Sequence, residues 1–378
     1  MLNLYIVLSN NRTAVKYFIN RDILERIIKI ELKGQERMSK KIVTFGEIML
    51  RLSPYNYERV VQASQFKVNY GGGEANVAVS LANYGHEVYF ITRLPNQYVG
   101  DAALNHLRAY GVRTDYIQRG GSRLGIYFLE HGASIRPSKV VYDRANSAIA
   151  ETKSGMFDWD TIFKDKEWFH ITGITPALSP NVAEVSLEAV QNAKKHGLTV
   201  SCDLNYRKKL WMRDEAKKVM TKLVEYVDVV IANEEDAADV FGIEAETTDV
   251  TTGVLDLEKY KSVATQLMDV CNAKLVTITL RESLSASDNN WSAMLYNGKD
   301  FIVSRKYPIH LVDRVGGGDS FGAGLIHGLS QDWDQEKALN YAVAASGLKQ
   351  TIPGDMNLVK EDEVLSITKG DISGRVQR

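Results

Sequence analysis

The stretch DRVGGGDSFGAG, residues 313–324, decides the fold class more than any other part of this 378-residue chain. Three consecutive glycines, Gly316, Gly317 and Gly318, precede the acidic Asp319, which opens an apolar segment expected to be a helix. Residues without Cβ leave their backbone N–H groups free to surround an anion, and a helix N-terminus adds the positive end of its dipole. A carboxylate inside such a site makes sense if it accepts a proton from a hydroxyl that attacks a phosphoryl group. The segment therefore predicts phosphoryl transfer to an alcohol.

The structural alternative for the same stretch is a glycine turn followed by an aspartate that caps a helix. The small residues Gly322, Ala323 and Gly324 favour the binding interpretation, because a nucleotide-binding helix needs close backbone approach. No Lys-Ser or Lys-Thr follows the glycines, so the stretch is not a Walker A loop, and it does not match GxGxxG either.

Composition narrows the classes of partner. The chain is 44% hydrophobic and 25% charged, with a formal net charge of −1 and no long basic run, so we expect neither nucleic acid nor a membrane as a partner. No segment reaches the ~18 apolar residues that span a bilayer. The two cysteines, Cys202 and Cys271, predict buried core residues and a reducing, cytoplasmic location rather than a disulfide framework.

The first 37 residues differ in pattern from the rest of the chain, because the first strand-like segment begins at Lys41, just after Met38. We interpret residues 1–37 as an N-terminal extension or a translated leader before a natural start at Met38, and residues 38–378 as the functional domain. The alternative is an amphipathic helix over residues 22–32 that packs on a neighbour.

Strand-like and helical segments alternate along most of the chain, which predicts βαβ units and a largely parallel sheet covered on both faces. The expected strands are residues 41–45, 88–92, 168–172, 198–203, 229–232 and 275–280. The expected helices are residues 74–84, 101–110, 182–196, 213–226, 235–241, 258–271, 319–330 and 335–349.

Two stretches interrupt this alternation. Residues 49–70 and 125–142 carry short β-like pieces, which we interpret as a small separate sheet that projects as a lid. Near the end of the chain, residues 291–296 and 301–305 flank Asn297-Gly298, which predicts a hairpin.

Two motifs together make the chain resemble the PfkB carbohydrate kinases, the ribokinase-like family. They are GGGEANVAVSLANYG at 71–85 and DRVGGGDSFGAG at 313–324. The resemblance runs from about Lys41 to the C-terminus and implies a three-layer α/β/α sandwich with a small β-sheet lid. Within the family, HITGITPALSP at 170–180, DLNYRKKLW at 203–211 and YDRANSA at 142–148 are most similar to 2-keto-3-deoxygluconate kinases.

The first motif predicts contact with a polyhydroxylated ligand. Gly72 and Gly73 allow close backbone approach, and the Asn76 amide offers both a donor and an acceptor for sugar hydroxyls. The alternative is a glycine turn that enters an amphipathic helix with Asn76 facing solvent. The resemblance assigns this loop to the sugar.

Arginines indicate the class of sugar. A sugar acid brings a carboxylate, and a guanidinium matches its two oxygens with parallel hydrogen bonds. Arg207 follows a predicted strand, at the end where α/β sheets bind ligands, and Arg144 lies on the predicted lid near Tyr127 and Tyr142. Surface salt bridges are the alternative. The resemblance implies that these positions hold the keto-acid end of the substrate.

The resemblance also implies ATP and Mg²⁺. Residues 233–236 (NEED) resemble the family's Asn-x-x-Glu motif, so Asn233 is expected near the phosphates, and Glu235 or Asp236 near the metal ion. A helix cap with acids in its first turn is the alternative. The remaining residues expected at the nucleotide, besides Gly316 and Gly318, are Thr279, Arg281, Ala345 and Lys349.

The function expected from these observations is transfer of the ATP γ-phosphate to the terminal hydroxyl of 2-keto-3-deoxygluconate, with Asp319 as the base and the three glycines stabilising charge. The alternatives are a neutral-sugar kinase of the ribokinase or fructokinase type, a kinase of another acid such as 5-dehydro-2-deoxygluconate, and a kinase-like sugar sensor. Pairing through the exposed lid predicts a homo-oligomer.

Overall fold

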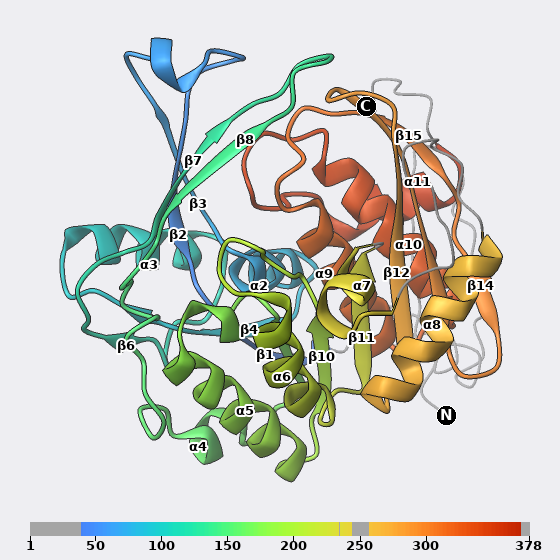
Figure 1. Ribbon diagram of the computed structural model, residues 1–378, viewed down its shortest axis with the longest axis horizontal. Helices are drawn as coiled ribbons and strands as arrows, with labels where there is room; N and C mark the ends of the chain where they lie inside the picture. Colours follow the sequence, from blue (N-terminus) through green and yellow to red (C-terminus); the bar gives the residue numbers. More distant parts are fainter. Residues whose placement is uncertain (1–38, 234, 244–256, 372–378) are drawn as a thin grey trace, which may run out of the picture. The chain divides into compact units, whose positions relative to one another are not determined.

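A mostly parallel β-sheet forms the middle layer of the chain (Figure 1). The computed structural model describes residues 39–233, 235–243 and 257–371. Within them the sheet order is β14-β13-β12-β11-β10-β9-β1-β4, with β15 also paired to β13. The strands are β1 Lys41–Phe45, β4 Glu87–Ile91, β9 Trp168–Thr172, β10 Thr199–Asp203, β11 Val229–Asn233, β12 Leu275–Ser283, β13 Asp288–Tyr296, β14 Phe301–Val303 and β15 Tyr307–His310. The predicted leader, or helix over 22–32, lies outside the described residues.

The strands from β4 to β12 run parallel, so their carboxyl ends meet at one edge of the sheet. The register there pairs Thr172 with Asp203 and Asn233 with Thr279. β13 runs antiparallel to β12 at the other side of the sheet. β13 and β14 form the predicted hairpin there. This shared edge is where an open α/β sheet binds its ligands.

Helices cover both faces of the sheet, and alternate strand residues supply two cores. Ile42 packs into the core under α2 Gly73–Asn83, α3 Tyr98–Ala109, α9 Gly317–Ser330, α10 Gln335–Lys349 and α11 Glu361–Thr368. Its neighbour Val43 packs into the opposite core, under α4 Trp159–Phe163, α5 Pro180–Lys195, α6 Arg213–Val224, α7 Asp236–Phe241 and α8 Leu257–Cys271. This period-two alternation explains the apolar strands and confirms the predicted three-layer α/β/α sandwich.

A second sheet projects from the first as the predicted lid (Figure 1). Its order is β3-β2-β7-β8, built from β2 Met49–Ser53, β3 Lys67–Gly71, β7 Ile126–Glu130 and β8 Lys139–Asp143. A pair of two-residue strands, β5 Arg93–Leu94 and β6 Gln118–Arg119, is separate from both of these sheets. Both long interruptions of the helix–strand alternation therefore belong to one sheet.

Some elements escaped the sequence analysis because their local signals are weak. α4 has five residues, too few to show a helical period, and β15 contains Pro308, which usually argues against a strand. α11 is a short helix whose first turn is wholly acidic. Cys202 and Cys271 are free and buried, as predicted. In the part of the chain that the structure describes, we find no helix with the length and apolarity to cross a membrane.

Candidate active site

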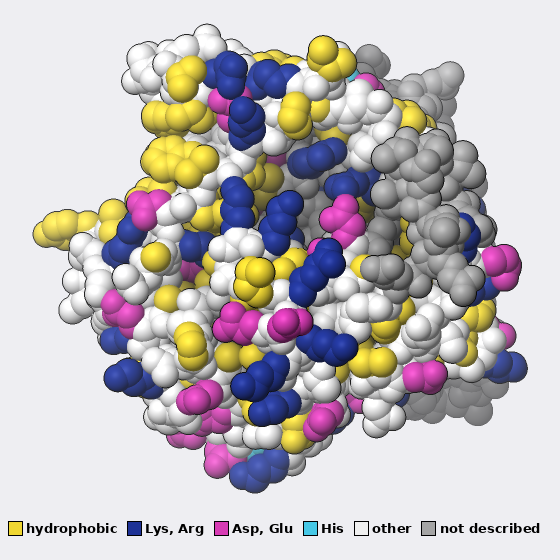
Figure 2. Space-filling view, in the orientation of Figure 1, with side chains coloured by type: hydrophobic (Ala, Val, Ile, Leu, Met, Phe, Trp, Pro, Cys, Tyr) yellow, Lys and Arg dark blue, Asp and Glu magenta, His cyan; other side chains and the backbone are white. Residues whose placement is uncertain are grey.

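A cavity of about 390 Å³ lies at the carboxyl edge of the sheet, where lid, helices and strand ends meet. This volume suits a small-molecule site. Strand-end residues Asp203, Asn233 and Thr279 line one side, and lid residues Tyr127 and Tyr142 line another, together with Arg144. In Figure 2, Lys and Arg side chains form a band from the lid toward the middle of the face shown, which favours anionic ligands.

The glycine loop forms the floor of the cavity at the start of α9. Gly316 is the residue before the helix and has φ of 83°, a left-handed conformation that favours glycine. The backbone N–H groups of Gly316, Gly318 and Asp319 have no acceptor among the described residues. A Cβ on Gly318 would meet no atom within 4 Å, so this glycine faces open space. The loop therefore presents free amides to an open volume, at the positive end of a helix dipole.

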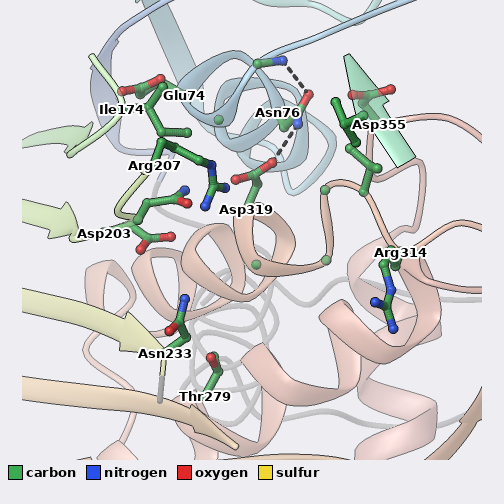
Figure 3. A pocket seen from close by; sticks show the side chains of 18 of the residues that line it. Glu74, Asn76, Ile174, Asp203, Arg207, Asn233, Thr279, Arg314, Asp319 and Asp355 are labelled. Carbon is green, nitrogen blue, oxygen red and sulfur yellow. Dashed lines mark hydrogen bonds between the residues drawn. The ribbon is translucent and has the colours of Figure 1, made fainter. Parts of the chain in front are cut away.

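Asp319 stands at the edge of this loop and connects it to the first glycine motif. Its Oδ2 accepts a hydrogen bond of 2.6 Å from Nδ2 of Asn76 (Figure 3). Burial raises the pKa of Asp319 to about 6, while the Asn76 hydrogen bond and the nearby Arg207 oppose that rise. A carboxylate with this pKa is mostly ionised at neutral pH and can still take up a proton, which suits a general base.

The first motif lies against α9 because α2 packs on that helix. Gly72 and Gly73 both line the cavity. A Cβ on Gly72 would lie 1.9 Å from the carbonyl oxygen of Glu47, so only glycine fits there. The residue after these glycines, Glu74, is buried and accepts hydrogen bonds from Thr172 and Thr175, and burial raises its pKa to about 7.

Arg207 projects into the cavity from the loop after β10, and its guanidinium points toward Asp319 (Figure 3). Its Nη1 donates to the Tyr206 carbonyl oxygen at 3.1 Å. No carboxylate of the described residues forms an ion pair with Arg207. The cavity therefore contains a guanidinium whose charge no described acid neutralises by direct contact.

Arg144 lies in a different electrostatic setting. Its Nε donates to Oε2 of Glu47 at 2.8 Å, a second hydrogen bond joins its Nη2 to the same oxygen, and the guanidinium lies 5.4 Å from the Tyr142 ring centroid. The other carboxylate oxygen of Glu47 is buried and has no hydrogen-bond partner, and Glu47 itself lines the cavity. Arg144 is at the predicted place, but an acid that the sequence analysis missed already pairs with it.

The predicted metal residues separate into two groups. Asn233 and Glu235 line the cavity. Asp236 is buried, and its two carboxylate oxygens accept the backbone N–H groups of Tyr206 and Asn233, so it shapes the loop. No group of three or more His, Cys, Asp or Glu side chains in the described segments is arranged to hold a metal ion. A hydrated Mg²⁺ still fits Asn233 and Glu235, since this ion keeps several waters and takes few protein ligands.

Thr279 and Arg281 line the far end of the cavity, where Arg314 and Trp291 join them. Burial and the nearby Arg281 lower the pKa of Arg314, which indicates two cations close together. Two such cations in one wall favour the binding of a polyanion.

Two residues predicted at the nucleotide, Ala345 and Lys349, are absent from the cavity lining. Both are fully buried. Ala345 packs where α10 crosses α9, near Gly324. The Lys349 ammonium lies under the glycine loop, where it donates to the Asp313 carbonyl oxygen at 2.9 Å. Ala345 is therefore a packing residue, whereas Lys349 supports the glycine loop from beneath.

The structure also adds cavity residues that sequence reasoning missed: Glu47, Glu74, Asp355 and Arg314. Asp355 follows Pro353-Gly354, which has the local pattern of an ordinary turn. Arg314 belongs to the second glycine motif, but nothing in its spacing indicated which way its side chain points. Each becomes a cavity residue only through contacts between distant segments.

Comparisons with known proteins agree with this geometry. Residues 39–362 match the pattern of the pfkB family carbohydrate kinases. A 2-dehydro-3-deoxygalactonokinase of Haloferax volcanii is 31% identical over 337 residues, which cover 89% of this chain and 99% of the relative.

Two solved structures are similar along nearly the whole described chain. The 2-dehydro-3-deoxygluconokinase of Thermotoga maritima is 52% identical with a TM-score of 0.84, covering 88% of this chain and 100% of that one. A PfkB family carbohydrate kinase of Listeria grayi is 35% identical with a TM-score of 0.81, covering 87% and 100%. The two glycine loops, the lid and the extent of these matches lead to one conclusion: the chain belongs to the pfkB family of carbohydrate kinases.

Proposed function

We propose that this kinase transfers the γ-phosphate of ATP to the terminal hydroxyl of 2-keto-3-deoxygluconate. The observation that carries this proposal is that Asp319 and the guanidinium of Arg207, which forms no ion pair with any described acid, share one cavity. A neutral sugar requires no such cation, whereas the carboxylate of a sugar acid does. The names of the Thermotoga maritima and Haloferax volcanii relatives point to the same class of substrate.

The proposed orientation follows from the kinds of residue that line the cavity. The keto-acid end lies at Arg207, with Arg144, Tyr127 and Tyr142 on the lid side. The hydroxylated part lies against Gly72, Gly73 and Asn76, and the terminal hydroxyl reaches Asp319. The triphosphate extends from the glycine loop toward Asn233, Thr279, Arg281 and Arg314.

The chemistry assigned to these residues is a single displacement. The oxygen of the substrate hydroxyl bonds to the γ-phosphorus, and Asp319 accepts the proton of that hydroxyl. At the same time the bond from the γ-phosphorus to the bridging oxygen breaks, and ADP leaves. The free amides of Gly316 and Gly318, with the start of α9 at Gly317, stabilise negative charge on the transferred group. Bound Mg²⁺, held through water by Asn233 and Glu235, would neutralise phosphate charge.

Substitution of Arg207 tests whether the substrate is a sugar acid or a neutral sugar. Arg207→Ala removes charge-assisted hydrogen bonds of about 1.5–3 kcal/mol, so KM for the sugar acid should rise about 10- to 100-fold while KM for ATP changes little. Arg213→Ala is the matched control, because Arg213 lies six residues further on, on α6, and pairs with Asp239 outside the cavity. Both variants are assayed by coupled ADP release.

The same assay on a panel of acceptors separates the alternatives. Equal or better turnover of fructose or ribose, unaffected by Arg207→Ala, would identify a neutral-sugar kinase and refute the proposal. Preference for 5-dehydro-2-deoxygluconate or for the galacto epimer, 2-keto-3-deoxygalactonate, would keep the class and change the substrate. Ligand binding without ADP release would identify a sensor.

We also propose that the protein forms a homo-oligomer through the lid. Val68 and Val141, on β3 and β8, are 58% and 61% exposed, an unusual exposure for apolar side chains on a sheet. Covering them with a second copy removes this apolar surface from water. Light scattering at micromolar concentration tests this proposal, and a monomer there would contradict it.

A further inference from the structure

A buried arginine on the lid is bonded to the segments that surround the glycine loop. Arg51 lies on β2 and is 1% exposed. Its Nη1 donates to Oδ2 of Asp355 at 2.7 Å, and its Nη2 donates to Oδ2 of Asp313 at 2.5 Å. Its Nε donates to Oγ of Ser53 at 2.8 Å on the same strand. One guanidinium therefore joins the lid to two acids that lie far away in the sequence, near the C-terminal end of the chain.

Asp313 in turn shapes the two loops beside the amides. Its Oδ1 accepts the backbone N–H of Val315 at 3.1 Å, and its Oδ2 accepts that of Gly354 at 3.0 Å. The first bond sets the turn that leads into Gly316. The second attaches that turn to the segment after α10, so a displacement of Asp313 moves both loops.

Asp355 makes the second connection. It lines the cavity, and its Oδ1 accepts a hydrogen bond from the hydroxyl of Tyr127 on lid strand β7. Its backbone carbonyl oxygen lies 2.0 Å from where a Cβ on Gly316 would stand, so this segment is in close contact with the glycine loop. Two lid strands and both loops thus share one hydrogen-bond network.

We propose that Arg51 is a positioning residue that fastens the lid to the glycine loop, so that the free amides of Gly316 and Gly318 reach their catalytic arrangement only with the lid in place. Arg51 does not line the cavity, so it acts through Asp313 and Asp355 rather than on a ligand. This inference rests on the proposed function only for its kinetic readout.

Lysine is the informative replacement for this residue. Arg51→Lys keeps the positive charge, but an ammonium cannot offer the fixed fork of donors that reaches both carboxylates and Ser53 at once. We expect kcat to fall about tenfold or more, since small displacements of catalytic groups reduce rates by up to ~10²-fold. The change in kcat should be larger than the change in KM for ATP.

A matched control separates positioning from stability. Asp228 is a buried acid at the opposite edge of the sheet, where it accepts the Val200 N–H at 2.9 Å and pairs with Lys194 and Lys274. Asp228→Asn and Arg51→Lys should both lower the thermal midpoint, because each breaks ion pairs of a buried side chain, but Asp228→Asn should leave kcat unchanged. If both variants lose stability and both keep wild-type kcat, Arg51 is only structural and the proposal is wrong.

Hydrogen exchange measured by mass spectrometry provides a readout that needs no substrate. Arg51→Lys should speed exchange in a peptide covering residues 313–320, whereas Asp228→Asn should not. Unchanged exchange in that peptide would overturn the proposal, even if the protein turned out to phosphorylate a different sugar. Conversely, faster exchange in an enzyme inactive on sugar acids would refute the proposed function alone.

Ser53→Ala covers the case in which Arg51→Lys does not fold. It removes the Nε contact and leaves the guanidinium and both carboxylates in place, so the protein should remain stable. We expect faster exchange over residues 313–320 and a measurable fall in kcat. Wild-type exchange and wild-type kcat in this variant would contradict the fastening role.

Discussion

The two glycine loops of the cavity look alike in sequence, GGGE at 71–74 and GGGD at 316–319, but they use glycine for different reasons. In the first loop the missing side chains make room for the protein itself: a Cβ on Gly71 or Gly72 would collide with Asp355 or with the Glu47 carbonyl. In the second, the backbone of Asp355 constrains Gly316 in this way, whereas Gly318 faces open space.

The acids that follow the two glycine runs, Glu74 and Asp319, also differ in their surroundings. Both acids line the cavity, but the Glu74 carboxylate accepts hydrogen bonds from two threonines, whereas the Asp319 carboxylate accepts one from Asn76. Glycine therefore makes room for protein atoms at Gly71 and Gly72, whereas at Gly318 it leaves the backbone open to the cavity. Substitutions in the two loops can separate these two roles.

The largest effect should follow from Asp319→Asn. Loss of a general base reduces kcat by about 10²–10⁴-fold, and the isosteric amide keeps the contact region filled. The thermal stability of Asp319→Asn at pH 8 should be no lower than that of the wild type. Because the folded pKa of about 6 exceeds the unfolded value of 3.8, the carboxyl favours folding most at low pH, and that contribution is lost as pH rises through about 6. Steady-state kinetics and thermal unfolding at pH 8 measure both quantities.

An Asp319→Asn variant that keeps more than about a tenth of wild-type kcat would show that another group takes the proton. An equivalent Glu74→Gln variant serves as the contrast. Since Glu74 is buried among protein donors, its replacement should change stability more than kcat. If Glu74→Gln instead changed kcat more than stability, the two loops would not differ in the way proposed.

Alanine in each loop gives the next largest effect. Gly318→Ala places a methyl group where we expect the phosphoryl group, so kcat should fall about 10²–10³-fold with an unchanged thermal midpoint. Gly72→Ala places a methyl 1.9 Å from a carbonyl oxygen and should lower the midpoint markedly, since overpacking costs about 1–3 kcal/mol or more. Equal losses of stability in the two variants would contradict the comparison.

The smallest effect should follow from removing the hydrogen bond between Asn76 and Asp319, which joins the two loops. The rate should rise with pH through an apparent pKa near 6 and then level off, because Asp319 must be ionised to accept the proton. The Asn76 hydrogen bond lowers the pKa of Asp319, so Asn76→Ala should move that midpoint to higher pH. A pH–kcat profile of both proteins measures the shift, and a shift to lower pH would refute the assignment.

Much of the architecture could be predicted because it depends on local patterns. The strand at Trp168–Thr172 and the helix at Gln335–Lys349 have the predicted bounds, since apolar period and turn residues mark their ends within a few positions. The lid could be inferred from two interruptions of the alternation. Its pairing order, with β2 beside β7, was not predictable from spacing.

The cavity was only partly predictable. Asp319, Asn76 and Arg207 follow recognisable motifs or strand ends, and they lie together as expected. Lys349 shows the limit: a lysine in the last turn of a helix is locally an ordinary C-terminal residue, and only the packing of α10 against the glycine loop buries it. Likewise, no motif in the sequence around Glu47 predicts that it pairs with Arg144.

By itself, the sequence determined the alternation of strands and helices, the two glycine loops and the acid after each, because these features depend on residues a few positions apart. Tertiary structure alone decided which residues donate hydrogen bonds to each of these acids, and that Arg51, Asp313 and Asp355 meet. Those outcomes depend on contacts between segments far apart in the chain, where burial and hydrogen bonding, rather than local backbone preference, set the arrangement.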